Sequence, residues 1–338
     1  MIRNSRRYWV ATATAMVLLQ AAPAAQPQQV ERAQVTLSPW GPQDEIGRLN
    51  LMTPQSRAEI LARIDGGAVY DLSVEYFIGM PGWHAAGDPQ YQIWMTHTPR
   101  GTAIDDPLGV GQKQNAHVGY TGSAISMYSH TGTHIDALNH FGLDGRIWNG
   151  FEADLHLGDR GWTRTGAETI PPIIARGVLL DVAAALGVEM LPSGYRIRRG
   201  DIERTLQKQQ MQLRAGDVVL IRTGRMKQYD NAQAYVASPP GLTLEAARFL
   251  VEEGGAMTVG ADNLSFETFP SEVAGNYIPV HTYLLAQQGA HILELVNLEE
   301  IARDRVHEFA FIAASLKLRG ADAAPLRPIA LPLRQGVR

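Results

Sequence analysis

Hydrophobic and polar positions follow two different periods along the chain, which predicts a mixture of helices and strands. Apolar residues recur with helical spacing, and a glycine follows closely, in three segments: 53–65, 199–212 and 242–254. Unbroken apolar runs, typical of strands buried on both faces, occupy 177–182 and 217–223. Patterning also predicts strands at 68–76 and 308–319. This alternation favours a mixed α/β architecture with no linker-like segment between residues 30 and 330.

One long segment, residues 77–120, has no clear period and is rich in Gly, Pro, Trp and His. We expect long loops or short hairpins here, and long ordered loops in a compact domain are usually functional. Its aromatic side chains are candidates for the wall of a substrate pocket: Trp83, Trp94, Phe77 and Tyr91. For all of these except Trp83, plain core packing is the preferred interpretation.

The first 25 residues have the pattern of a secretory signal peptide. Arg3, Arg6 and Arg7 precede an apolar run at 9–19, and small residues follow at 22–25. The apolar run is shorter than the ~20 residues of a membrane span, which disfavours a permanent anchor. We therefore expect an exported, periplasmic protein whose mature domain is 26–338, carried by the general or the twin-arginine route and without a membrane partner after cleavage.

Composition narrows the chemistry. Of 338 residues, 45% are hydrophobic and 19% charged, which is typical of a globular protein. The formal net charge is -4 and no basic block is present, so no nucleic-acid partner is expected. The chain has no cysteine, which excludes disulfides, thiolate zinc sites and cysteine nucleophiles. Any metal must be held by His, Asp or Glu.

A first cluster of such residues places His130, His134, Asp136 and His140 within 11 positions. Imidazole and carboxylate groups are ligands of zinc, manganese and iron. Neither a continuous helix nor a straight strand lets these side chains converge on one point. The segment must bend, and Gly132 is where the backbone can do so. We expect a strand end, a tight turn, and then a short helix that places Asp136 and His140 one turn apart.

A second cluster contains His281 and Glu294. Residues 282–288 are predicted to form a short helix ending at Gly289, and 291–296 a strand. Such a helix climbs roughly 11 Å and the strand returns roughly 15 Å, so both side chains are expected at the same end of the unit. In the alternative interpretation Glu294 pairs with an arginine and His281 caps a helix.

The run from His130 to Phe141 closely resembles the signature of the cyclase family of metal-dependent hydrolases, which includes bacterial kynurenine formamidase and isatin hydrolase. Further segments resemble the same family at 40–50, 216–224, 279–281 and 292–294. One departure is Leu138, which stands where the motif usually has proline. This change alters the chain between Asp136 and His140 but removes no candidate ligand.

The resemblance implies a metal centre built from both clusters. A first divalent ion would be bound by His130, His134 and Asp136. In the two-metal members of the family, Asp136 and Glu294 bridge to a second ion, which His281 completes. One or two ions are therefore expected, with zinc preferred and manganese as the alternative, because an imidazole and carboxylate set serves both.

The resemblance also implies the activity and the fold. His140 would be the general acid/base, and Trp83 would lie against the substrate. We expect water, activated by the ion, to cleave an amide, lactam or ester bond of a small aromatic or cyclic carbonyl compound. The implied fold is a swivelling β/β/α-type α/β domain, assembled as a homodimer or homotetramer. The rival interpretation is a non-catalytic exported metal- or ligand-binding protein, which would have no use for His140.

Overall fold

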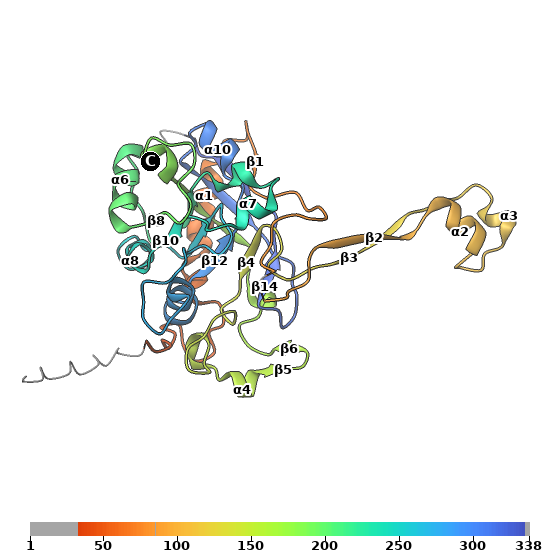
Figure 1. Ribbon diagram of the computed structural model, residues 1–338, viewed down its shortest axis with the longest axis horizontal. Helices are drawn as coiled ribbons and strands as arrows, with labels where there is room; N and C mark the ends of the chain where they lie inside the picture. Colours follow the sequence, from red (N-terminus) through yellow and green to blue (C-terminus); the bar gives the residue numbers. More distant parts are fainter. Residues whose placement is uncertain (1–32, 85, 335–338) are drawn as a thin grey trace, which may run out of the picture. The chain divides into compact units, whose positions relative to one another are not determined.

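A nine-stranded mixed sheet forms the centre of the computed structural model, which describes residues 33–84 and 86–334 (Figure 1). In spatial order its strands are β1 (Tyr70–Asp71), β15 (Ile329–Pro332), β13 (Glu308–Ala313), β7 (Ile173–Asp181), β9 (Val218–Arg222), β11 (Thr258–Ala261), β12 (His291–Glu294), β4 (His134–Asp136) and β14 (Ala323–Pro325). The strands β7, β9, β11 and β12 pair in parallel, and the remaining pairs are antiparallel. The predicted α/β class is confirmed. The expected signal peptide lies outside the described residues.

Three helices correspond to the predicted helical segments. They are α1 (Pro54–Arg63), α6 (Arg199–Gln209) and α8 (Leu244–Arg248), which continues as the π-helix η5 (Phe249–Glu253). The start of α1 is fixed by a capping box, in which Thr53 and Ser56 exchange side-chain to backbone hydrogen bonds. No helix in the described part of the chain has the length and apolar character needed to cross a membrane.

Shorter elements complete the described chain. The helices are η1 (Gly47–Leu51), η2 (Trp148–Gly150), α4 (Ala153–His156), η3 (Ala167–Thr169), α5 (Val182–Ala185), η4 (Arg225–Gln228), α7 (Ala232–Val236) and α10 (Glu299–Arg303). Two small sheets pair β5 (Leu157–Gly158) with β6 (Gly161–Trp162) and β8 (Arg196–Ile197) with β10 (Gly241–Leu242).

The central strands are buried on both faces, which explains why they read as unbroken apolar runs. Along β9, Val219 and Ile221 pack into a core that includes residues of α6 and α8. The alternate residues Val218 and Leu220 pack into a second core on the opposite face. Each such side chain contributes about 1.5–3 kcal/mol by leaving water. The two cores together hold the strand ends that carry the site.

The boundaries of two predicted strands are wrong. The segment 68–76 pairs only at β1, because beyond it the backbone finds other partners: Leu72 N donates to Pro328 O, and Val74 N donates to the hydroxyl of Thr133. The segment 308–319 ends as a strand at Ala313, where its ladder with β7 stops.

Within 77–120 the prediction of loops or short hairpins is also wrong in part. Strand β2 (Gln92–His97) pairs with β3 (Gly122–Ser126), and α2 (Pro99–Asp105) and α3 (Gln112–Asn115) lie between them in the chain; we call residues 92–126 the arm (Figure 1). Phe77 and Tyr91 pack in a small core, as expected. Trp94 does not, since it lies on the arm and is 50% exposed.

Candidate metal centre and active site

The bend expected at Gly132 is present and is held by an aromatic ring. Gly132 has a φ of +63°, and a Cβ atom there would lie 2.4 Å from the ring of Tyr76. The Tyr76 hydroxyl donates to the carbonyl oxygens of Thr131, at 2.8 Å, and Thr133, at 3.2 Å. Only glycine fits this approach and this backbone conformation. The bend brings His130 back beside the residues that follow it.

After the bend the chain forms β4, and the short helix predicted to carry Asp136 and His140 is absent from this segment. The strand persists because both of its edges are paired: His134 lies opposite Glu294 of β12, and Asp136 lies opposite Ala323 of β14. A turn follows, closed by the hydrogen bond from His140 N to Ala137 O. His134 and Asp136 therefore project from alternate positions of one strand, to the same face.

The second cluster folds as the spacing predicts. Helix α9 (Pro279–His281) continues as the π-helix η6 (Thr282–Gln287), Gly289 has a φ of +60°, and β12 returns to Glu294. His281 Nε2 then lies 3.3 Å from Glu294 Oε1. Glu294 Oε2 accepts a hydrogen bond from Ser265 N at 2.9 Å, and the arginine partner of the alternative interpretation is not found among the described residues.

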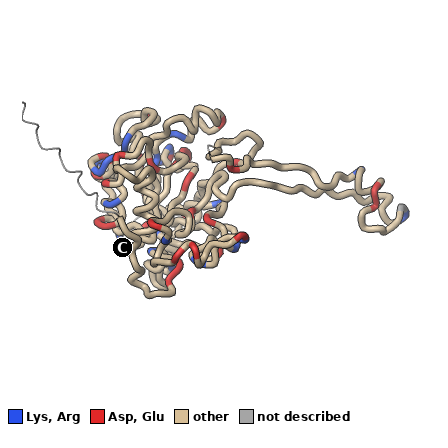
Figure 2. Tube along the Cα trace, turned by 60° about the horizontal axis from the view of Figure 1, so that its bottom comes forward, with Lys and Arg blue, Asp and Glu red and all other residues tan. Residues whose placement is uncertain are grey.

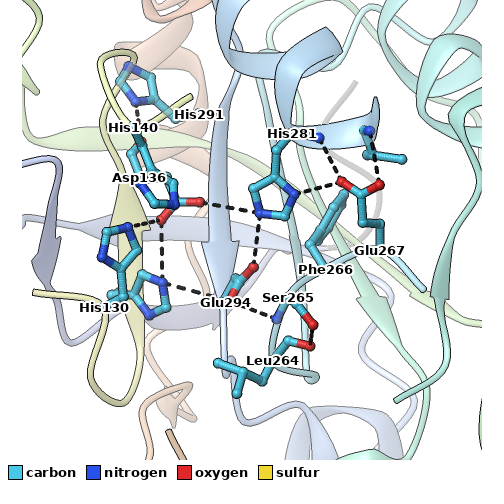
Figure 3. Close-up of polar contacts among 12 residues, drawn as sticks. His130, Asp136, His140, Leu264, Ser265, Phe266, Glu267, His281, His291 and Glu294 are labelled. Carbon is cyan, nitrogen blue, oxygen red and sulfur yellow. Dashed lines mark hydrogen bonds and ion pairs between the residues drawn. The ribbon is translucent and has the colours of Figure 1, made fainter. Parts of the chain in front are cut away.

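The two clusters meet at Asp136 (Figure 3). Its Oδ1 atom lies 3.2 Å from His130 Nε2 and 3.3 Å from His134 Nε2. Its Oδ2 atom lies 3.9 Å from His281 Nε2. His134 Nε2 is in turn 3.8 Å from Glu294 Oε2. The structure thus brings the five predicted ligands together at the carboxyl end of β12, where α/β sheets commonly bind ligands.

This arrangement fits a divalent cation. His130, His134 and Asp136 can hold one ion, as can Asp136, His281 and Glu294, because the ligand atoms of each trio lie within 4.8 Å of one another. The Nε2 atoms of His130 and His134 and both carboxylate oxygens of Asp136 are buried without a hydrogen-bond partner among the described residues. Buried polar atoms are costly without partners, and a metal ion would satisfy all of them at once.

Each candidate histidine ligand is oriented through its other ring nitrogen. His134 Nδ1 donates to Gly132 O at 2.8 Å, His281 Nδ1 donates to Glu267 Oε1 at 2.8 Å, and His130 Nδ1 lies 3.2 Å from the hydroxyl of Ser129. Every Nε2 atom is thereby turned toward the carboxylates. Such outer contacts fix the tautomer and ring orientation of metal-binding histidines.

Glu267 was not anticipated from the sequence. It is only 2% exposed and accepts hydrogen bonds from His281 N, at 2.9 Å, and Val280 N, at 3.1 Å, besides the imidazole (Figure 3). No motif surrounds it. The two residues before it, Ser265 and Phe266, have left-handed backbone conformations, with φ of +71° and +47°.

Protonation in the cluster is set by burial and by the paired charges. Burial, followed by the neighbouring His140, lowers the pKa of His130 to about 4. Burial alone would raise the pKa of Asp136, but contacts with His130 and His134 hold it well below its ordinary value. Burial would lower the pKa of His281, yet Glu267 and Glu294 raise it to about 10. An ion at Asp136 and Glu294 must displace the His281 proton, so its binding releases protons.

His140 lies beside the cluster with one nitrogen facing another unanticipated acid. Its Nδ1 atom is 3.6 Å from Asp322 Oδ2, and Asp322 Oδ1 accepts from the Ser129 hydroxyl at 2.8 Å. The His140 and His130 ring centroids are 4.0 Å apart. Because His130, His140 and Asp322 also lie close enough to share an ion, the geometry alone does not restrict His140 to proton transfer.

A cavity of about 580 Å³ opens onto these residues. His130, His140, His281 and Glu294 line it, and so does Trp83, the predicted substrate contact. Trp83 is 40% exposed and packs obliquely against Phe269, with ring centroids 6.2 Å apart. A small molecule in this cavity can therefore touch the cluster and an aromatic wall simultaneously.

Comparison with known proteins assigns the family. The description "Putative cyclase" matches residues 70–268, more than half of the chain. The chain belongs to the cyclase family. A kynurenine formamidase of Bacillus cytotoxicus is 29% identical over 212 residues, 62% of this chain and 79% of that protein. Cyclase-like protein 3 of Oryza sativa subsp. japonica is 24% identical over 266 residues, 78% of this chain and 80% of that protein.

Solved structures agree with the assignment. A crystal structure of a novel cyclase matches with a TM-score of 0.76 and 28% identity, covering 86% of this chain and 95% of that one. Isatin hydrolase A from Ralstonia solanacearum shares the fold, with a TM-score of 0.59 and 22% identity over 78% of this chain and 92% of that one. The identification as a cyclase-family hydrolase is confirmed.

Proposed function

We propose that this protein is a metal-dependent hydrolase that cleaves an amide, lactam or ester bond of a small aromatic or cyclic carbonyl compound. One observation carries the proposal: side chains from two distant segments converge on Asp136, leave buried ligand atoms unpartnered, and line a cavity with the imidazole of His140. The similarity to kynurenine formamidases supports an amide as the bond cleaved.

We assign the metal ligands as His130, His134 and Asp136 for one ion and Asp136, His281 and Glu294 for a second. The sharing of Asp136 by both trios supports the two-ion form. Zinc is the proposed metal and manganese the alternative, because the set contains only imidazole and carboxylate groups.

A bound divalent ion supplies a water of lowered pKa and a positive charge that polarises a carbonyl oxygen. His140 takes the proton of the attacking water and returns it to the leaving nitrogen or oxygen. Asp322, on the Nδ1 side of the ring, keeps Nε2 directed toward the cavity. Trp83 holds the ring of the substrate against the aromatic wall.

The deciding experiment is metal analysis of the purified protein together with hydrolysis assays on aryl formamides, isatin-like lactams and lactones. We expect one or two equivalents of zinc and turnover that is lost with chelator and restored with zinc or manganese. Stoichiometric metal without turnover of any compound would favour the rival function, an exported metal- or ligand-binding protein.

We propose further that the chain forms a homodimer or homotetramer. The arm supports this, because its paired strands carry no charged residue (Figure 2). The side chains of Ile93, Trp94, Met95 and Ile125 on these strands are exposed. Contiguous exposed apolar surface of this kind marks an interaction site in soluble proteins.

We also propose export to the periplasm, on the pattern of the first 25 residues. Expression of the full chain followed by cell fractionation tests this, with Arg6→Lys and Arg7→Lys separating twin-arginine from general export. Recovery of the uncleaved chain in the cytoplasm would contradict the proposal.

A further inference from the structure

Apart from the candidate metal ligands and His140, the lining of the cavity is largely apolar and aromatic. Trp83, Leu264, Phe269, Tyr277 and Ile278 line it. The oblique rings of Trp83 and Phe269 form an aromatic surface, and Tyr277 is 70% exposed. A volume of about 580 Å³ admits a molecule of one or two fused rings.

The charges around this cavity are unbalanced. None of the described residues that line it is lysine or arginine. Beyond Glu294, which belongs to the proposed ligand set, the lining contains a further carboxylate, the half-buried Asp88. Tyr128 lines the same cavity as Asp88. The Tyr128 ring stacks on His130 with centroids 4.6 Å apart.

We propose that the substrate bears no negative charge on the part remote from the scissile bond, and that Asp88 determines this specificity. The cavity accepts a neutral or cationic aryl amide or lactam and disfavours one with a carboxylate on its ring. The inference rests on the proposed hydrolytic function and adds the substrate's charge class to it.

The physical reason is that a carboxylate of the substrate would lose its hydration in this cavity without gaining a favourable charge interaction. A carboxylate entering an apolar wall loses water and finds no cationic side chain to replace it. It also meets Asp88, and like charges close together in a partly buried site repel strongly. An ammonium group at the same place would instead gain an ion pair with Asp88. The charge must be tested far from the reacting carbonyl, because a positive ion held by Asp136 and Glu294 attracts any nearby carboxylate.

Three para-substituted formanilides of similar size provide the test: 4-formamidobenzamide is neutral, 4-formamidobenzoate anionic and 4-formamidobenzylamine cationic. Formate release by the zinc-loaded protein gives kcat/KM for each. We expect kcat/KM for the neutral and the cationic compound to be at least about tenfold higher than kcat/KM for the anionic compound. Asp88→Asn should reduce the ratio of kcat/KM for the neutral compound to kcat/KM for the anionic compound. Asp88→Lys should make the anionic compound the better substrate. These ratios compare substrates within one variant, so partial loss of folded protein does not affect them.

Asp154→Asn and Asp154→Lys are matched controls, since Asp154 is exposed and does not line the cavity; they should leave the ratios unchanged. The inference would be overturned if the parent protein had the same kcat/KM for the anionic and the neutral compound, or if the Asp88 variants left the ratio unchanged. In either case the hydrolytic function would stand. If no compound releases formate, the hydrolytic function fails for this class. Calorimetric binding of the matching anilines, 4-aminobenzamide and 4-aminobenzoate, then decides the charge preference alone.

Discussion

The imidazole of His281 depends on a carboxylate that no sequence motif reveals. Glu267 accepts its Nδ1–H and two backbone N–H groups, so the ring is held with Nε2 toward Asp136 and Glu294. We predict that Glu267→Gln weakens zinc binding about 10- to 100-fold, because the amide lacks the charge that orients and polarises the imidazole. Competition with a chromophoric chelator measures this affinity.

The matched control is Glu272→Gln, since Glu272 belongs to the same segment but pairs with Arg198 at the surface. It should bind zinc as tightly as the parent chain. Unchanged affinity in Glu267→Gln would show that the hydrogen bond has no role in holding the metal.

A substitution at His140 should distinguish metal binding from catalysis, because we assign this residue to proton transfer and not to the metal. Its place in the cavity next to His130, with Asp322 on its Nδ1 side, suits proton transfer to a reacting group. We predict that His140→Ala retains the parent metal content and loses at least about a hundredfold in kcat, the usual range for a general acid/base. Elemental analysis and steady-state kinetics measure the two quantities, with the exposed His117→Ala as control. Loss of an equivalent of metal would instead identify His140 as a ligand.

The sequence alone predicted the site residues that are close together in the chain or joined by elements of known length. It did not predict the site residues that distant parts of the chain contribute. His130 to His140 lie close in the chain, and a glycine bend suffices to gather them. His281 and Glu294 are linked by a helix and a strand of calculable length, so their approach could be predicted. Glu267 and Asp322 could not, because their positions follow from left-handed turns and from the pairing of β14 with β4.

At the scale of elements, a buried arginine ties three strands together at one end of the sheet. Arg176 of β7 donates to Asp217, just before β9, and to Glu308 of β13, each at 2.7 Å. Burial would raise the pKa of Glu308, but Arg176 outweighs burial and holds it below the ordinary value of 4.5. The stabilisation is therefore fully present above about pH 4.5 and is lost as the pH falls through the lowered pKa of the folded state.

We predict that Glu308→Gln lowers the free energy of unfolding by about 1–2 kcal/mol at pH 7, since it removes a charged hydrogen bond from a buried guanidinium. The difference from the parent chain should shrink toward zero as the pH falls below 4.5. Urea unfolding of metal-free protein at several pH values tests this. Glu300→Gln, which breaks only an exposed pair with Arg303, should change little. A difference that does not vary with pH would contradict the linkage.

Element prediction succeeded where one pattern determines the outcome. The apolar runs of β7 and β9 are buried on both faces, and the helix predicted within 53–65 is present as α1, which begins after the N-cap residue Thr53. It failed where a partner far away in the chain decides. The turn after Asp136 follows a strand rather than a helix because β12 and β14 occupy both edges of β4. Neither pairing is visible in the local sequence.

At the scale of the molecule, the arm is difficult to explain for a chain that acts alone. Its strands pair with each other, Ile93 lies opposite Ile125, and both side chains are exposed. The charged residues of the arm belong to the segment between the strands, so the strands themselves present an uncharged apolar surface; these residues are Arg100, Asp105, Asp106 and Lys113. A second copy would offer the same surface and cover this one by symmetry. Trp94 projects to the other face of the two strands, where it is also exposed.

We predict that the double variant Ile93→Lys with Ile125→Lys shifts the protein from dimer or tetramer to monomer, because two added charges on one apolar face oppose its burial. Light scattering after size-exclusion chromatography measures the mass. Leu155→Lys, at a residue that is 73% exposed outside the arm, is the control and should keep the parent mass. Zinc content should be retained in the monomer, since all five proposed ligands come from one chain. A parent protein that is monomeric at micromolar concentration would remove the need for a partner and leave the apolar surface of the arm to another interaction.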